Sequence, residues 1–369
     1  MAGASSSSAI RRTTRRATPF RRSWSDSRVP AEPRAIALVK LSSLGDVIHA
    51  LPVADALSAA FPRARLAWLV ERREAALLRD HPALDEVIDV DTRAWRSART
   101  PRQALGVLRE LTTLRRRLRA GRFDVAIDLQ GLVKSGAVAR ATGAPLRIGF
   151  APGWSRERLS AVFTTRRVTP PPQASHVVDQ YLALLEPLGV TMPPGRARFR
   201  LPSRAAAESR IDDFFVGVGL KPRHRLVVLN PGAGRGNKRW PVASFRALAE
   251  RLCHEGDAQV LVLWGPREHE AARAIVEMPA PRPALAPPTD LDELAAVARR
   301  ASVMVAGDTG PLHLAAAVGT PCVGLYGPTS AARNGPYGTG HRVIAAPDGK
   351  MASIDVPSVL DAVLAVIGR

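Results

Sequence analysis

Short apolar runs alternate with longer segments whose apolar residues recur at helical spacing, and this alternation extends along most of the chain. Short runs bounded by polar residues or glycine indicate buried strands, and the longer periodic segments indicate helices. We expect strands at 35–39, 66–70, 86–90, 123–129, 147–150, 226–229, 260–264, 303–306 and 321–326. We expect helices at 47–60 (an amphipathic one), 71–79, 102–119, 241–254 and 312–318, and one that ends at 180–188. Strands that alternate with helices predict an α/β fold with parallel sheets.

Prolines and glycines interrupt both patterns between Gly189 and Pro202, which indicates a linker. A length of 369 residues suits two domains. We therefore place a domain boundary near 190–200, with Rossmann-like domains at 34–190 and 200–369.

Residues 1–33 are rich in serine and arginine and have no hydrophobic periodicity, so we expect a disordered leader. The leader has no apolar core of the kind that secretion signals carry. A wrongly assigned start codon and a membrane-surface tether are the alternatives. The chain has no apolar stretch of about 18 residues, so no transmembrane helix is expected.

The chain is strongly basic, with 53 lysines and arginines against 33 acidic residues and a net charge of +20. Such a surface attracts nucleic acid, anionic lipid or an acidic small molecule. No RNA-binding signature or helix-turn-helix pattern is present. The arginines at 115–117 and 119 form either a solvated helix face or a binding site. The two cysteines, Cys253 and Cys322, suit buried positions in a reducing compartment.

The segment from Val303 to Thr329 combines strand, turn and helix in a form that suits a ligand. Asp308 or Thr309 is expected to cap the helix, Pro311 suits its first position, and Gly319 ends it. A helix N-terminus beyond a strand presents free N–H groups, where α/β proteins hold phosphate. Because a carboxylate repels phosphate, we expect Asp308 to accept hydrogen bonds from sugar hydroxyls. The combination indicates a sugar nucleotide; the alternative is a capped turn without a ligand.

Two turns in the N-terminal half also follow strands, where open α/β sheets place their sites. Asp46 stands after the first strand at a helix start, where the dipole favours an acid even without a catalytic role. Lys40 and His49 flank Asp46 and suit an anionic ligand. The turn after another strand adds three polar candidates: Gln130, Lys134 and Ser135.

The loop at 230–236 is rich in glycine, so its backbone can approach a phosphate closely, and Lys238 adds a positive charge. It is not a Walker A loop, because no G-K-[ST] follows. A carboxylate after the strand at 260–264 suits ribose hydroxyls, and both Glu268 and Glu270 are eligible. No strict G-x-G-x-x-G follows the first strand and no metal-ligand spacing is present, so we expect neither a nicotinamide cofactor nor a metal.

Four motifs give the chain a resemblance to a known family. They are K-L-S-S-L-G-D-V-I-H-A-L-P at 40–52, D-L-Q-G-L-V-K-S at 128–135, N-P-G-A-G-R-G-N-K-R-W-P at 230–241, and D-T-G-P-L-H-L-A-A at 308–316 with G-L-Y-G-P-T at 324–329. In this order they resemble the glycosyltransferase family 9 heptosyltransferases, which build the lipopolysaccharide inner core from ADP-heptose. The resemblance covers roughly residues 34–368.

The resemblance implies a GT-B fold, with two Rossmann-like domains facing each other across a cleft. It implies an inverting, metal-independent transfer in which Asp46 is the catalytic base. The expected donor contacts are Ala233, Gly234, Lys238, Glu268 or Glu270, Asp308, Thr309, Gly310 and His313. The expected contacts with the Kdo–lipid A acceptor are Lys40, His49, Gln130, Lys134 and Ser135. His313 has a purely structural role as its alternative.

The basic N-terminal domain suits both an anionic acceptor and an anionic membrane surface. We therefore expect a cytoplasmic protein in peripheral contact with the cytoplasmic face of the inner membrane, and no nucleic-acid partner. The motifs at 40–52 and 128–135 look most like those of family members that act on Kdo.

Ala233 and Gly234 depart from the hydroxyl side chains that the family pattern can carry, so the donor preference could differ. Transfer of another nucleotide-activated sugar, or to a later core acceptor, is the alternative within the family. A basic nucleic-acid-binding protein on an inert scaffold is the rival from another class, but it gives Asp46 and Asp308 no role. The oligomeric state is not predicted.

Overall fold

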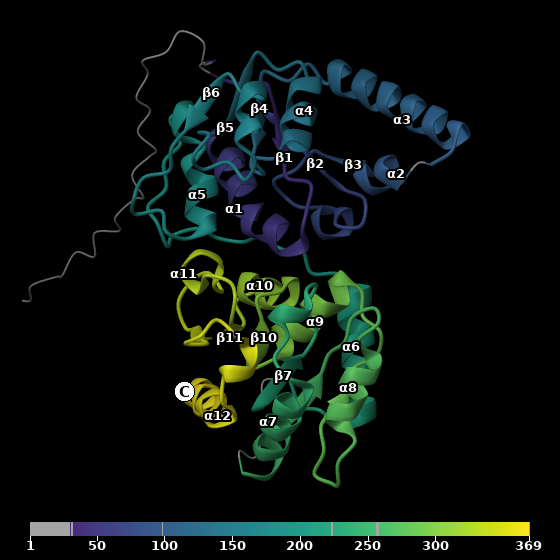
Figure 1. The fold of residues 1–369 in the computed structure, drawn as a ribbon, viewed down its shortest axis with the longest axis vertical. Coiled ribbons are helices and arrows are strands. Elements are labelled where there is room, and N and C mark those ends of the chain that lie inside the picture. Colours follow the sequence, from purple (N-terminus) through teal and green to yellow (C-terminus); the bar gives the residue numbers. More distant parts are fainter. Residues whose placement is uncertain (1–29, 31, 98, 223, 256–257, 369) are drawn as a thin grey trace, which may run out of the picture.

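The structure is a computed structural model that describes residue 30 and residues 32–97, 99–222, 224–255 and 258–368. Nearly all of the predicted leader, and with it the expectation of disorder, lies outside the described residues. Two sheets, each of six parallel strands, organise the rest of the chain (Figure 1). The predicted α/β class is therefore confirmed.

The first sheet has the strand order β3-β2-β1-β4-β5-β6. Its strands are β1 (Ala35–Val39), β2 (Arg65–Glu71), β3 (Glu86–Val90), β4 (Val125–Asp128), β5 (Leu146–Phe150) and β6 (Arg166–Val168). The helices of this half are α1 (Leu44–Ala60), α2 (Thr92–Ser97), α3 (Pro101–Ala120), α4 (Val133–Ala141) and α5 (Val177–Ala183). The chain changes direction across the sheet between β1 and β4, so this is a topological switch point.

The second sheet has the order β12-β11-β10-β7-β8-β9, which repeats the order of the first sheet within its own half. Its strands are β7 (Leu226–Asn230), β8 (Gln259–Val262), β9 (Ala284–Leu285), β10 (Val303–Gly307), β11 (Cys322–Tyr326) and β12 (Arg342–Ala345). The helices are α6 (Ala205–Val218), α7 (Val242–His254), α8 (His269–Val276), α9 (Leu291–Arg300), α10 (Gly310–Ala317), α11 (Ala331–Asn334) and α12 (Val356–Ile367). Its switch point lies between β7 and β10.

The central strands of both sheets are buried along their whole length. β1, β7, β10 and β11 are continuous apolar or nearly apolar segments, and every residue in them is buried. Helices cover both faces of parallel sheets, which explains why these strands read as unbroken apolar runs. The segment 189–204 between the halves carries no helix or strand, and the proposed domain boundary falls within it.

Two expected elements differ in the structure. The helix predicted at 71–79 is only a 3₁₀ turn at Ala75–Leu78, because Glu71 still belongs to β2 and its N–H donates to Leu41 O at 2.9 Å. Helix α1 is not amphipathic, since it is buried on nearly all sides. It lies between the sheet, α5 and α10 of the other half (Figure 1), so no face of it needs to be polar.

The described residues contain no helix that is both long enough and apolar enough to cross a membrane.

Candidate functional site

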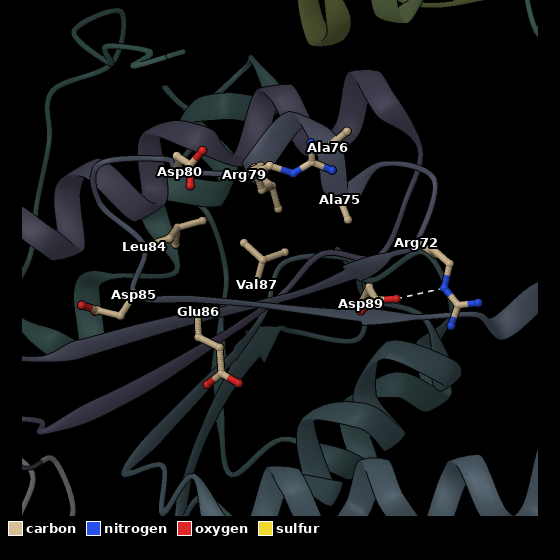
Figure 2. Close-up of a pocket in the computed structure, with 11 residues that line it drawn as sticks. Arg72, Ala75, Ala76, Arg79, Asp80, Leu84, Asp85, Glu86, Val87 and Asp89 are labelled. Carbon is tan, nitrogen blue, oxygen red and sulfur yellow. Dashed lines mark hydrogen bonds and ion pairs between the residues drawn. The ribbon is translucent and has the colours of Figure 1, made fainter. Parts of the chain in front are cut away.

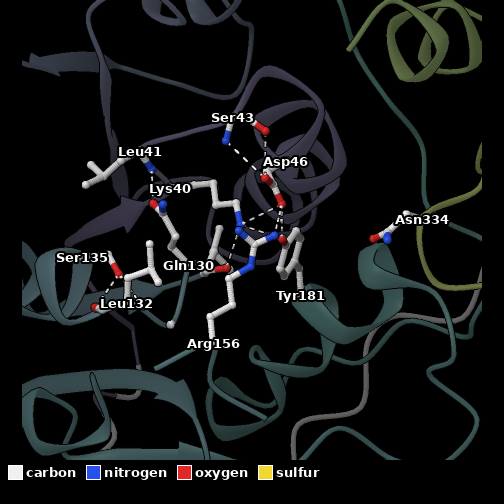
Figure 3. A network of polar contacts seen from close by, with 12 residues as sticks. Lys40, Leu41, Ser43, Asp46, Gln130, Leu132, Ser135, Arg156, Tyr181 and Asn334 are labelled. Carbon is white, nitrogen blue, oxygen red and sulfur yellow. Dashed lines mark hydrogen bonds and ion pairs between the residues drawn. The ribbon is translucent and has the colours of Figure 1, made fainter. Parts of the chain in front are cut away.

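Asp46 lies in the first turn of α1, directly after the turn that follows β1 (Figure 3). The N–H and hydroxyl of Ser43 donate to Asp46 Oδ2 at 3.2 and 3.0 Å. The other oxygen, Oδ1, lies 3.1 Å from Arg156 Nη2, 3.6 Å from Lys40 Nζ and 3.4 Å from the Tyr181 hydroxyl. The carboxylate is thus fixed by a helix cap on one side and by two cations on the other.

These contacts determine the charge state of the site. Burial alone would raise the pKa of Asp46, but Lys40, Arg156 and the hydrogen bonds from Ser43 outweigh it and lower the pKa to about 2. Burial lowers the pKa of Lys40 to about 8, although the attraction of Asp46 opposes this shift. At neutral pH Asp46 is therefore a carboxylate and Lys40 is mostly an ammonium group.

Lys40 does not face solvent in this structure. It is fully buried, and its Nζ donates to Leu129 O at 3.2 Å and to the Tyr181 hydroxyl at 2.6 Å. Gln130 is also buried, and its Oε1 accepts a hydrogen bond from Leu41 N–H at 2.8 Å. These contacts tie the turn after β1 to the turn after β4, so the two side chains position the loop that carries Asp46.

The other predicted acceptor residues divide by exposure. Ser135 and His49 are buried, and the Ser135 hydroxyl donates to Leu132 O at 2.9 Å. Lys134 keeps 30% of its side chain exposed, and its Nζ lies 3.3 Å from Thr92 Oγ1. Of the five predicted contacts, Lys134 therefore presents the most accessible charge at the edge of the sheet.

Two residues around Asp46 were not among the predicted ones. Arg156 lies in the loop after β5 and keeps 47% of its side chain exposed, so it is a second accessible cation at this edge. The rule that sites follow strand ends would have found it, because the strand at 147–150 was expected. Tyr181 comes from α5, and no local pattern in the sequence connects it with Asp46.

The C-terminal half brings Asp308, Lys238 and His313 together at its own switch point. Lys238 Nζ lies 2.6 Å from Asp308 Oδ2, and His313 Nε2 lies 3.0 Å from Oδ1. Burial alone would raise the pKa of Asp308, but the bonds from His313 and Lys238 hold it well below its usual value. Thr309 is the N-cap residue of α10, and Gly310 begins the helix. The first N–H groups of a helix have no partner within it, so this end can bind an anion.

The loop at 230–236 lies beside Glu268. A Cβ on Gly232 would overlap the Glu268 carboxylate, so a larger residue here would push that side chain away from the loop. Glu268 Oε2 accepts from Gly265 N–H at 3.0 Å, and Arg239 Nη2 lies 3.3 Å from Oε1. Glu270 is exposed in the first turn of α8.

The remaining two donor-side candidates differ in accessibility. Ala233 is buried, and its carbonyl accepts hydrogen bonds from the Arg239 guanidinium at 2.9 and 3.1 Å. Gly234 is exposed, and no heavy atom lies within 4 Å of the position that a Cβ would take. The backbone at Gly234 is therefore open to a ligand.

The two halves meet where α1 packs against α10 (Figure 1). A Cβ on Gly310 would lie 2.5 Å from Leu44 Cδ2, and a Cβ on Gly45 would lie 2.7 Å from His313 Cδ2. Both glycines are therefore needed for this close approach. The contact sets the helix that carries Asp46 directly against the helix that follows Asp308.

Three histidine rings lie next to one another where the two halves meet. The ring centroids of His49 and His313 are 4.2 Å apart, and those of His49 and His176 are 5.4 Å apart. Burial holds the pKa of His49 well below its usual value, so its ring is neutral. A neutral His49 ring allows the halves to pack together here without adding a buried charge.

A cavity of about 520 Å³ lies away from both switch points, beside the edge strand β3 (Figure 2). Its rim carries Arg72, Asp80, Glu86 and Asp89, and the Arg72 guanidinium pairs with Asp89 at 2.9 Å. None of the predicted site residues lines it. Across the part of the chain that the structure describes, no group of three or more His, Cys, Asp or Glu side chains is arranged to hold a metal ion.

Two doubly wound sheets whose switch points carry the candidate residues, and which meet through α1 and α10, define the GT-B class of fold. The family model "Glycosyltransferase family 9 (heptosyltransferase)" matches residues 111–363. The chain belongs to this family, and it is a glycosyltransferase.

Individual relatives agree with this assignment. Lipopolysaccharide heptosyltransferase 1 of Salmonella typhimurium is 31% identical over 88% of this chain and 98% of its own length. Lipopolysaccharide heptosyltransferase 1 of Pseudomonas aeruginosa is 32% identical over 82% of this chain and 81% of its own. The solved structure of E. coli heptosyltransferase WaaC with ADP-2-deoxy-2-fluoro heptose is 30% identical, with a TM-score of 0.71 over 89% of this chain and 98% of that one.

Proposed function

We propose that this protein transfers heptose from ADP-heptose to the Kdo region of the lipopolysaccharide inner core, with inversion at the anomeric carbon. One observation carries the proposal: the ionised Asp46 carboxylate stands on a helix packed against the N-terminus of α10, beside the Asp308 cluster. Relatives named lipopolysaccharide heptosyltransferase 1, and a solved relative with an ADP-heptose analogue, support this donor and this class of acceptor.

In the proposed step Asp46 takes a proton from an acceptor hydroxyl. The oxygen attacks the anomeric carbon from the face opposite ADP while the bond from that carbon to the diphosphate oxygen breaks. The leaving diphosphate takes the bonding electrons. The backbone N–H groups of Thr309 and Gly310, the loop at 232–236 and the Lys238 ammonium group stabilise its charge. Asp308 accepts hydrogen bonds from hydroxyls of the sugar.

The pKa of about 2 makes Asp46 a weak base before the acceptor binds. Arg156 is half-exposed, so its guanidinium can turn from Asp46 to the carboxylate of an arriving Kdo residue. This exchange removes one of the two cations that stabilise the Asp46 carboxylate, and the pKa of Asp46 then rises. The anionic acceptor thereby activates its own base. Lys134 is a second contact for that acceptor.

For the nucleotide we propose Glu268 rather than Glu270. Glu268 lies against the glycine-rich loop and is held there by Gly265 N–H and Arg239, whereas Glu270 is exposed. A carboxylate fixed beside this loop suits ribose hydroxyls better than a free one, because less side-chain entropy is lost on binding. At Gly234 the open backbone takes the place of a hydroxyl side chain in contacts with phosphate.

An acceptor that carries lipid A lies at a membrane surface. We therefore propose that the protein works on the cytoplasmic face of the inner membrane, in peripheral contact with anionic lipid.

Mass spectrometry of Kdo–lipid A after incubation with the protein and ADP-heptose tests the function. The expected result is a gain of one heptose, which the Asp46→Asn variant does not produce at the same enzyme concentration. No gain on Kdo–lipid A, together with a gain on a later core acceptor or from another sugar nucleotide, would contradict the proposal and identify the alternative.

A further inference from the structure

Helix α3 has little contact with the rest of the protein. It is 20 residues long, and Leu118 near its end is the one residue in it that is buried. Figure 1 shows α3 at the end of the N-terminal half that lies away from the C-terminal half, with its first turns projecting beyond the neighbouring helices. Most helical stability in proteins comes from packing against the rest of the fold, and the projecting turns of α3 have little of it.

The projecting turns carry an apolar face. Leu105, Leu108 and Leu111 are exposed by 49%, 57% and 38%. Leu108 and Leu105 turn progressively away from the side of the helix that Leu111 shares with Leu114 and Leu118, and this shared side packs against the N-terminal half at Leu114 and Leu118. The part of this side that lies beyond the core is therefore left in contact with water.

An apolar groove continues this face toward the body. It has a volume of about 360 Å³ and lies between α2, α3 and α4. Its apolar lining comes from Trp95, Leu111, Leu114 and Val138, among others, and three cationic side chains also line it: Arg96, Arg115 and Lys134. Apolar surface with cations around it suits a ligand that has an apolar part and an anionic part.

The charge on α3 is almost entirely positive. Glu110 is its one acidic residue, and Glu110 already accepts a hydrogen bond from Trp95 Nε1 at 2.9 Å. Within the described residues, five arginines of the helix make no ion pair: Arg102, Arg109, Arg115, Arg116 and Arg119. These charges are available to a partner of opposite sign.

We propose that the exposed face of α3, together with the groove beside it, binds the surface of an anionic lipid bilayer. Leucines enter the boundary between headgroups and acyl chains, and arginines contact the anionic headgroups. The proposal rests on the proposed function, because it assigns an element of the fold to the membrane contact that a lipid-linked acceptor requires.

Charge and area favour the bilayer over other partners. A second copy of the chain would place arginines of one helix against those of the other, and like charges oppose such a contact. Three leucines also fall short of the roughly 800 Å² that each partner of a stable interface buries. Nucleic acid would satisfy the arginines but leave the leucines without a role.

Sedimentation with lipid vesicles tests the surface. We expect the protein to bind vesicles of phosphatidylcholine with phosphatidylglycerol and to bind pure phosphatidylcholine vesicles weakly. Combined substitution of Leu105→Ser, Leu108→Ser and Leu111→Ser should weaken binding by about tenfold or more, because the apolar insertion is lost. The matched control is Val216→Ser with Val218→Ser on α6, which removes exposed apolar side chains from the other half and should leave binding unchanged.

Unchanged vesicle binding by the triple leucine variant, with a melting temperature like that of the wild type, would overturn the proposal. Two other results would also overturn it. One is a wild-type dimer that the triple leucine variant no longer forms in sedimentation velocity, and the other is wild-type binding to duplex DNA that is tighter than its binding to vesicles. A transfer assay with a lipid-free Kdo acceptor tests the proposed function independently of membrane binding. Heptose transfer to that acceptor should be the same in the triple variant and the wild type. Vesicle binding through α3 without any heptose transfer would refute the proposed function, and the proposal that α3 binds the bilayer would still stand.

Discussion

Each half of the molecule has a lysine–aspartate pair at its switch point, and the two pairs differ in how free the lysine is. Lys40 Nζ lies 3.6 Å from Asp46, and the lysine side chain is 1% exposed. Lys238 Nζ lies 2.6 Å from Asp308, and that lysine is 21% exposed. The same two residue types on the same sheet topology therefore face different surroundings.

The difference indicates that the two lysine–aspartate pairs have different roles. Lys40 is held by Leu129 and Tyr181 in the core, so it stays with Asp46 and determines the basicity of that carboxylate. Lys238 stands on a short loop after β7, so it can turn from Asp308 to a phosphate. The N-terminal pair suits proton transfer, and the C-terminal pair suits the binding of a charged donor.

The largest expected effect comes from Asp46→Asn, which keeps the size of the side chain but cannot accept the proton. A general base contributes roughly 10²–10⁴-fold in rate, so kcat should fall by about that factor in a steady-state assay. Asp213→Asn, in an exposed position on α6, is the matched control and should keep full activity. Full activity of Asp46→Asn would reduce Asp46 to a helix cap.

Lys238→Ala should weaken ADP binding by about 1.5–3 kcal/mol, because a charge-assisted hydrogen bond to the diphosphate is lost. Adenosine, which has no phosphate, should bind as before. Calorimetry with both ligands measures the difference, and Lys221→Ala is the control for loss of a lysine elsewhere in this half. Equal ADP affinity of Lys238→Ala and the wild type would show that Lys238 pairs with Asp308 but does not contact the diphosphate.

Asp308→Asn should have a smaller and more selective effect. The loss of hydrogen bonds to sugar hydroxyls should weaken ADP-heptose by about 1.5 kcal/mol. ADP should bind equally well or more tightly, since Lys238 no longer has Asp308 as a partner. An equal loss of affinity for the two ligands, measured by calorimetry, would argue against the sugar contact.

A further prediction concerns pH. The pKa of Asp46 in the ligand-free protein is about 2, so the carboxylate should cause no fall in kcat/KM between pH 7 and pH 4.

The pH dependence of stability involves Lys40, whose pKa is about 8, below its usual value of 10.5. The folded protein therefore loses this proton before the unfolded chain does, and Lys40 should make stability rise between pH 8 and 10.5. Thermal unfolding of the wild type and Lys40→Met over this range checks the sign; the rise should be smaller in the variant.

The sequence predicts best those features that depend on neighbouring residues. Apolar runs located the central strands, and strand ends located Asp46, Lys238 and Asp308, because parallel sheets place their sites at those ends. The expectation of an amphipathic α1 was wrong because the helix is covered by α10, which lies more than 200 residues further along the chain.

Contacts between distant segments explain the rest. Arg156 and Tyr181 reach Asp46 across separations of 110 and 135 residues. The position of Arg156 after an expected strand marks it as a candidate, but no local pattern indicates Tyr181. The burial of Lys40 likewise depends on how α5 packs against α1. The choice between Glu268 and Glu270 depends on the contacts of Glu268 with Gly265 and Arg239. The hydrophobic periodicity of the sequence does not predict these contacts.

The division of work between the two lysine–aspartate pairs is tested most directly by titrating ADP-heptose into the Asp46→Asn variant. We propose that the N-terminal pair serves proton transfer and the C-terminal pair holds the donor, so the dissociation constant should stay within about twofold of that of the wild type. A tenfold or greater loss of donor affinity in a variant that melts like the wild type would contradict this division.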